Sequence, residues 1–193
     1  MNIIQIGCND GNDHVFKFVN ENSFMINKLL LIDAVSFCID KAKETYKNFN
    51  FVEFKTLVVT SERKQTMPFF ITSTSVHNYG QSSIYKNHVI QHVKNDSILE
   101  INVPNKHINE IISEFSEPII DRLYIDAEGS DVNLILNLDL SIKPINFIQY
   151  ETGHSDGVST QGRKGEMAME KLWNNGYDVT LIPEIDVRAI RRK

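Results

Sequence analysis

The sequence predicts an α/β fold: a mostly parallel sheet with helices on both faces and a C-terminal antiparallel hairpin. Short apolar segments alternate with amphipathic helical segments along most of the chain, as in folds whose helices connect parallel strands. The last segment, residues 177–190, instead has two alternating strand patterns on either side of Pro183 and Glu184. This pattern is typical of a hairpin.

The first half of the chain contains three of the expected strands. Residues 2–6 and 29–33 are short apolar runs, and residues 50–59 are predicted to form a third strand. Between them, a helix carries the apolar residues of 15–19, and an amphipathic helix spans 37–49. This order of strand, helix and strand predicts parallel pairing.

The segment from about 61 to 97 interrupts the alternation. It is polar and rich in turn residues, so we expect an irregular insertion with one added strand at 67–72. The alternation then resumes. The expected elements are strands at 98–103, 122–127 and 145–151, and helices at 107–115, 130–138 and 166–175, the last ending at Gly176.

Composition limits the classes of protein that fit. The chain has 193 residues and a net charge of −5, which suits one domain over 1–193 and argues against a general nucleic-acid binder, although 188–193 is basic. No apolar stretch is long enough to cross a bilayer and no leader pattern precedes the first strand, so we expect no membrane partner and a cytoplasmic location. Cys8 and Cys38 have a spacing that suits neither a zinc site nor a disulfide framework.

The turn after the first strand, from Gly7 to Gly11, is the first candidate binding element. Ligands of open α/β sheets bind beyond the carboxyl ends of the strands, usually at this turn. Gly7 lets the chain leave the strand sharply, Gly11 lets the backbone approach a ligand or a packed helix, and Asn9 tolerates a left-handed conformation. The turn has neither the glycine spacing of a dinucleotide site nor the lysine of a triphosphate loop.

The charges beside this turn favour a cationic or neutral ligand. Asp10 and Asp13 stand where a phosphate would bind a helix N-terminus, and they would repel it. S-adenosylmethionine carries a sulfonium and an ammonium group, and Asp33, at the end of the second strand, is positioned to accept hydrogen bonds from its ribose hydroxyls. Asp10 and Asp13 could equally cap the following helix.

Further along the chain, Asp126 and Glu151 each end an apolar strand, where a charge is costly unless it has a partner. Both should face the same crevice as Gly7, and His154 follows Glu151 closely. Acids at such a position can accept a proton from a hydroxyl, bind an ammonium group or hold a divalent ion. Glu151, His154 and Asp126 are therefore the candidates for a general base or for orienting an acceptor.

Two motifs resemble those of the FkbM family of S-adenosylmethionine-dependent methyltransferases. IGCNDG is similar to the family's D-V-G-A-N-x-G motif, and IDAEGSD is similar to its I-D-V-E-G-A-E segment. The matching positions are Gly7, Asn9 and Gly11 in the first motif and Asp126, Glu128 and Gly129 in the second. Smaller similarities are Ser82, Ser83, Glu151 and the pair Gly176-Tyr177.

The resemblance implies a Rossmann-like class I methyltransferase fold, S-adenosylmethionine as cofactor and O-methylation of a small-molecule or carbohydrate hydroxyl. The implied acceptor pocket is covered by the insertion around Tyr79 to Tyr85. The expected cofactor-binding residues are Gly7, Asn9, Asp10, Gly11, Asp33 and Asp126. We expect no metal site.

The sequence departs from the family pattern at three places. Gln5 replaces the acid that opens the first motif, Ala34 replaces the proline after the second-strand acid, and little precedes the first strand. Two alternatives therefore stay open. One is metal-assisted methylation with a divalent cation held by Asp126 and Glu151. The other is a non-catalytic member that binds S-adenosylmethionine without turnover.

Overall fold

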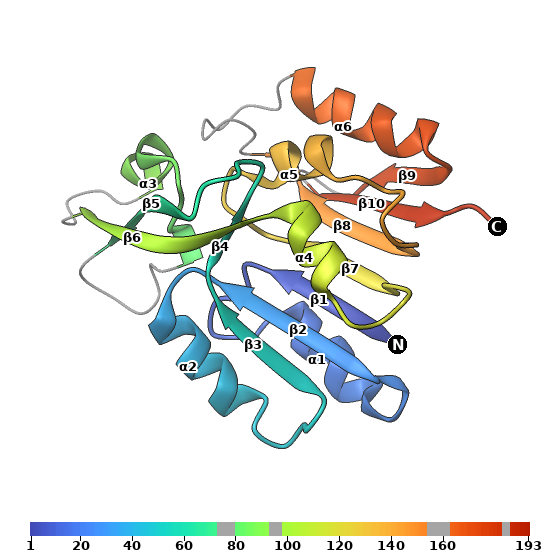
Figure 1. Ribbon diagram of the computed structural model, residues 1–193, viewed down its shortest axis with the longest axis horizontal. Coiled ribbons are helices and arrows are strands. Elements are labelled where there is room, and N and C mark those ends of the chain that lie inside the picture. The colour runs from blue at the N-terminus through green and yellow to red at the C-terminus, as the bar shows by residue number, and fades with distance from the viewer. Residues whose placement is uncertain (73–79, 93–97, 154–162, 183–185) are drawn as a thin grey trace.

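The computed structural model contains a seven-stranded and a three-stranded sheet (Figure 1), and it describes residues 1–72, 80–92, 98–153, 163–182 and 186–193. The seven-stranded main sheet has the order β3-β2-β1-β7-β8-β10-β9, and the second sheet has the order β4-β6-β5. The strands of the main sheet are β1 (Asn2–Ile6), β2 (Lys28–Asp33), β3 (Val52–Thr56), β7 (Arg122–Ile125), β8 (Phe147–Glu151), β9 (Tyr177–Leu181) and β10 (Asp186–Arg191).

Parallel pairing runs through the centre of the main sheet and ends at the hairpin. β1, β2, β3, β7 and β8 pair in parallel, whereas β10 lies antiparallel between β8 and β9. Strands buried on both faces are expected to be largely apolar, as in β2, whose residues 29–32 are all apolar and buried. The predicted mostly parallel sheet with a C-terminal antiparallel hairpin is therefore confirmed.

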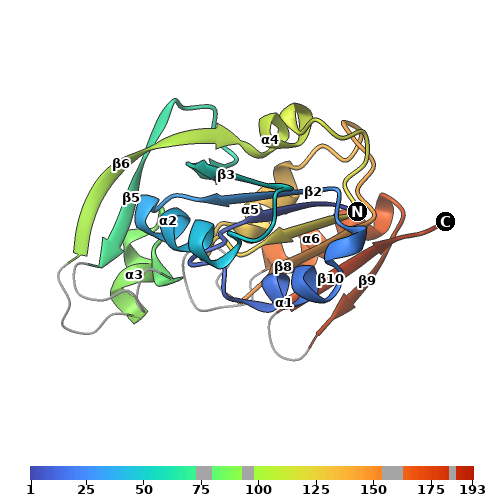
Figure 2. The same cartoon turned by 90° about the horizontal axis from the view of Figure 1, so that it is seen from below.

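Helices cover both faces of the main sheet (Figures 1 and 2). α1 (His14–Glu21) and α2 (Ser36–Thr45) pack on the face that carries Ile3 and Leu31, and a 3-10 turn, η1 (Ser23–Met25), follows α1. α4 (Ile108–Glu114), α5 (Asp131–Asn137) and α6 (Arg163–Asn174) pack on the face that carries Ile4 and Ile32. Successive residues of each strand thus pack alternately into the two cores. No helix among the described residues is long and apolar enough to cross a membrane.

The second sheet differs from the expectation. Residues 50–59 were expected to form one strand, but the chain divides at Leu57 into β3 and β4 (Val58–Thr60). Residues 98–103 were expected in the parallel sheet, but they belong to β6 (Ile98–His107), which pairs parallel with β4 and antiparallel with β5 (Thr66–Thr72). An apolar strand pattern does not specify which sheet the strand joins. Here Val103 and its neighbours pack against the start of α2 instead.

The segment from 61 to 97 also contains helix α3 (Lys86–His92), in which Val89 is fully buried. β5, β6 and α3 lie beyond the carboxyl ends of the parallel strands of the main sheet (Figure 2). These three elements thus stand over the edge at which an open α/β sheet binds ligands.

Candidate active site

Gly7 brings the first turn into direct contact with the end of β7. Its φ angle is +77°, and a Cβ at this position would lie 1.8 Å from the backbone oxygen of Asp126. The Gly7 amide donates to the Ile32 carbonyl at 2.8 Å, which ties the same turn to β2. The carboxyl ends of β1, β2 and β7 therefore converge at a position that only glycine fits.

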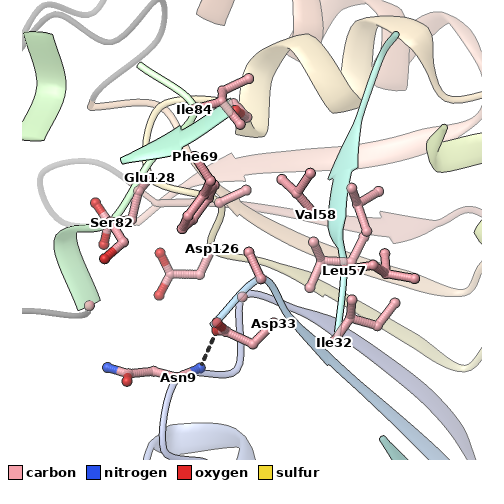
Figure 3. Close-up of a pocket in the computed structure, with 17 residues that line it drawn as sticks. Asn9, Ile32, Asp33, Leu57, Val58, Phe69, Ser82, Ile84, Asp126 and Glu128 are labelled. Atoms are coloured by element: carbon pink, nitrogen blue, oxygen red, sulfur yellow. Dashed lines mark hydrogen bonds between the residues drawn. The ribbon is translucent and has the colours of Figure 1, made fainter. Parts of the chain in front are cut away.

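Asp33 fixes the turn from the other side. Its carboxylate accepts a hydrogen bond from the Asn9 amide at 2.9 Å (Figure 3) and another from the Val35 amide, also at 2.9 Å. Burial raises the pKa of Asp33, although the bonds from these amides oppose the rise. Since an ionised carboxylate has about four acceptor positions, Asp33 keeps the capacity to accept from a ligand hydroxyl.

A first cavity lies between this turn and the second sheet. Figure 3 shows Asn9 and Asp33 at one end of it and Ile84 at the opposite end. One wall is apolar, and Ser82 lies opposite, with a buried Oγ that forms no hydrogen bond to the described residues. Its lining comprises Ile6, Gly7, Asn9, Ile32, Asp33, Ala34, Leu57, Val58, Val59, Phe69, Gly80, Ser82, Ile84, Asp126, Ala127, Glu128 and Ser130. An apolar slot with a carboxylate at one end can hold a flat ring joined to a hydroxylated group.

A second cavity adjoins the first, and Asp126 and Glu128 line both. It lies at the ends of β1, β7, β8 and β10, and most of its lining residues have polar side chains. The other lining residues are Gln5, His14, Tyr124, Ile125, Gln149, Tyr150, Glu151 and Asp186. The two cavities therefore form one site with an apolar part and an acidic part that meet at two carboxyl groups.

Crowding of the acids changes their ionisation. Desolvation, followed by the charges of Glu128, Asp126 and Asp186, raises the pKa of Glu151 to about 8. The Asp126 side chain is exposed in the cleft, but the walls around it displace bulk water. This desolvation is the main cause that raises the pKa of Asp126 well above the usual range, and the charge of Asp131 is the second. Such a site favours uptake of a proton or a cation.

Glu128 is held in place at the junction of the cavities. It has a φ angle of +45°, unusual for a residue other than glycine, and its carbonyl accepts from Ser83 Oγ at 2.7 Å. Its carboxyl group lies 2.9 Å from His88 Nε2. Burial raises the pKa of Glu128 to about 7 and lowers the pKa of His88. Strain of this kind is common at functional sites.

The comparison with protein families decides the class of protein. Residues 1–179 match the family described as the methyltransferase FkbM domain. The chain belongs to the FkbM methyltransferase family. This confirms the resemblance, the methyltransferase reaction class and S-adenosylmethionine as cofactor.

Solved structures similar to this FkbM chain have low sequence identity to it. A chain of a fibrillarin/Nop5p complex has a TM-score of 0.49 and 10% identity, over 98% of this chain and 72% of that chain. A ribosomal protein L11 methylase from Lactobacillus delbrueckii subsp. bulgaricus has a TM-score of 0.47 and 9% identity, over 100% and 70% of the two chains. A SAM-dependent methyltransferase from Aquifex aeolicus has a TM-score of 0.43 and 10% identity, over 98% and 80%. No curated protein sequence gives a significant match.

The structure brings several of the predicted FkbM site residues together. Gly7, Asn9, Asp33 and Asp126 line the first cavity, and Glu151 lines the second. His154 and Tyr79 lie outside the described residues.

Asp10 and Gly11 line neither cavity. The Asp10 carboxylate accepts from the Asn12 amide at 3.0 Å, and a Cβ on Gly11 would lie 3.2 Å from Ala42 Cβ and 3.0 Å from Tyr46. Gly11 therefore lets the turn approach a packed helix, which is one of the two roles expected for it. The capping alternative holds for Asp13, whose Oδ1 accepts from the amides of Val15 and Phe16.

Some lining residues gave no signal in the sequence. Phe69 and Val58 belong to strands whose apolar pattern is that of an ordinary core. Asp186 is the cross-strand neighbour of Glu151, a relationship set by the register of β10 against β8. The sequence signal for Asp186 is only an acid at the start of an alternating strand.

Proposed function

We propose that this FkbM methyltransferase transfers a methyl group from S-adenosylmethionine to a hydroxyl of a small molecule or carbohydrate. The observation that supports this best is the pair of adjoining cavities, one largely apolar and one acidic, which share Asp126 and Glu128. One reacting partner can occupy each cavity, and the reaction would take place near the shared carboxyl groups.

The first cavity fits the nucleoside of the cofactor. Phe69 and Ile84 offer apolar contacts to an adenine ring. Ser82 Oγ, which has no hydrogen-bond partner among the described residues, can bond one of the ring's polar edges. Asp33 would accept the ribose hydroxyls while keeping its bond to the Asn9 amide. The bound cofactor supplies an electrophilic methyl group on a sulfonium.

The second cavity fits an uncharged or cationic acceptor. Glu151 is our candidate general base, with Asp126 as the alternative and His154 as a further candidate. The reaction forms an O–C bond, breaks the methyl C–S bond and passes the hydroxyl proton to a carboxylate. Since an alcohol is a poor nucleophile until its proton is removed, a positioned carboxylate of raised pKa suits this role. The walls of the cleft align the reacting groups.

Calorimetry with S-adenosylhomocysteine, the product, tests the cofactor assignment. Asp33→Asn removes the charge but keeps one acceptor oxygen, so we expect affinity to fall by about 1–3 kcal/mol. Asp40→Asn is a matched control because Asp40 is an exposed acid on α2 that pairs with Lys43. Equal affinity in the Asp33 and Asp40 variants would move the ribose contact elsewhere. Methyl transfer to the hydroxyls of a glycoside panel then tests the reaction.

The metal-assisted alternative has less support. Within the described ranges, no group of three or more His, Cys, Asp or Glu side chains has an arrangement that could hold a metal ion. Asp126 and Glu151 come from separate strand ends and would be a small ligand set for a hard cation. A metal-independent transfer is therefore our proposal.

A further inference from the structure

The second cavity has an unusual charge composition. Four carboxyl groups line it, those of Asp126, Glu128, Glu151 and Asp186, and no lysine or arginine is among its described lining residues. Among the described lining residues, His14 is the only one whose side chain has basic character, and it is exposed. A ligand with a carboxylate or phosphate would be repelled here.

Two of these acids face each other across a strand pair. Glu151 and Asp186 are directly opposite in the antiparallel register of β8 and β10, so their side chains project from the same face of the sheet. Like charges at directly opposite positions destabilise a sheet. Asp186 Oδ2 also accepts from Gln149 Nε2 at 3.0 Å, which fixes its orientation. A cation bound between the two strands would be attracted by both carboxylates.

Gln5 provides an independent observation. Its side chain lines the same cavity and is only 2% exposed. Gln5 Nε2 donates to Asp13 Oδ2 at 2.5 Å, which fixes the orientation of the amide and leaves Oε1 as the other atom. Gln5 Oε1 is buried and receives no hydrogen bond from the described residues. Because a buried unpaired acceptor is costly, a donor from a ligand is the simplest partner for it.

We propose that the second cavity binds a protonated amine of the acceptor, so that the hydroxyl to be methylated belongs to an amino-bearing compound such as an amino sugar. This inference rests on the proposed function, because it assigns the second cavity to the acceptor. An ammonium group has three donors and one positive charge, which suits the neighbouring carboxylates of Glu151 and Asp186. Gln5 lies on β1, three strands from β10 in the sheet, and its Oε1 can accept from another donor of the same ligand. A metal ion would need a ligand cluster that the described residues do not form.

Side-chain amide signals in ¹H–¹⁵N NMR spectra of the S-adenosylhomocysteine complex provide the test. Glucosamine and glucose differ only by an ammonium group in place of one hydroxyl. We expect glucosamine to shift the Gln5 and Gln149 signals saturably, and glucose to leave them unchanged. Asp186→Asn should weaken glucosamine binding about tenfold or more, as expected for loss of a charged acceptor. Asp178→Asn is the control, since Asp178 is an exposed acid of the same hairpin.

A second variant keeps the test decisive if Asp186→Asn does not fold. Gln5→Met removes Oε1 at nearly constant size, and we expect it to weaken glucosamine binding about threefold to tenfold. Equal binding of glucose and glucosamine, or unchanged binding in these variants, would overturn the inference. Competition between glucosamine and S-adenosylhomocysteine would also overturn it, because the cavity would then hold the cofactor's ammonium group. Glucosamine binding by a protein that fails to bind S-adenosylhomocysteine would support the amine site and contradict the proposed function.

Discussion

The backbone of Gly7 passes so close to Asp126 that a Cβ on Gly7 would lie 1.8 Å from the Asp126 carbonyl oxygen. The contact joins the carboxyl ends of the neighbouring strands β1 and β7, beside the residues that line both cavities. A side chain here would have to displace backbone and not merely a flexible side chain. Gly7→Ala should therefore lower the free energy of unfolding by more than about 3 kcal/mol, measured by urea denaturation.

Gly176 offers a matched control for this substitution. It also has a left-handed φ angle, +88°, but a Cβ there would have no atom within 4 Å. Gly176→Ala should therefore cost only about 1 kcal/mol, the conformational penalty alone. Similar losses in the two variants would show that the approach to Asp126 does not constrain residue 7.

The stability of the ligand-free protein should fall as pH rises from about 4 to about 7. Asp131 is 2% exposed, and burial is the main cause that raises its pKa from the usual value of about 3.8 to about 7. The folded state therefore binds more protons than the unfolded state within this window, so the free energy of unfolding decreases with pH. Asp131→Asn keeps an acceptor for the Ala127 amide and removes the ionisation. The free energy of unfolding, measured by denaturation at a series of pH values, should fall less steeply with pH in this variant than in the parent protein.

Asp139 is the control for that pH series. Its carboxylate is exposed, and hydrogen bonds from Ser141 lower its pKa. A lowered carboxyl pKa affects stability in the opposite direction, because it stabilises the folded state at neutral pH and this stabilisation is lost as the pH falls. Asp139→Asn should therefore leave the fall between pH 4 and 7 in place. The same shallow profile in both variants would remove Asp131 as its source.

Most of the main sheet could be predicted from the sequence because its central strands are largely apolar and separated by amphipathic helices, and its last two strands alternate. The convergence of Gly7, Asp33 and Asp126 followed from one rule, that the carboxyl ends of parallel strands share an edge. The acids beside the first turn and the family motifs around these residues then indicated the cofactor.

The rest of the fold and of the site depends on strand register and on which sheet each strand joins. The periodicity of apolar residues specifies neither. An apolar run such as 98–103 has the same pattern in either sheet, so the second sheet and the apolar wall of the first cavity were not anticipated. The opposition of Glu151 and Asp186 arises only after the hairpin pairs with β8. Similarly, the contact of Gln5 with Asp13 depends on how the first turn folds back onto β1.

Turnover should survive chelation. Asp126 and Glu151 are the acids that the metal-assisted alternative requires, but carboxylates from two separate strand ends form a sparse site for a hard cation. We expect initial rates in EDTA to match those of the untreated protein. Loss of activity in EDTA, with recovery after addition of magnesium, would instead favour the metal-assisted mechanism.

Glu151 should set the alkaline dependence of the rate. A general base acts in its ionised form, and the pKa of Glu151 is raised to about 8, mainly by desolvation. We therefore expect kcat/KM to rise with pH and to level off above about pH 8, since this parameter reports the free enzyme. Glu151→Gln should remove this dependence and lower turnover by roughly 10²-fold, the scale of general-base loss, while affinity for S-adenosylhomocysteine stays unchanged.

Glu166→Gln, on the exposed face of α6, is the control. Normal turnover in Glu151→Gln would make Asp126 the candidate base, and a collapse of cofactor affinity would make Glu151 a cofactor ligand or a structural residue.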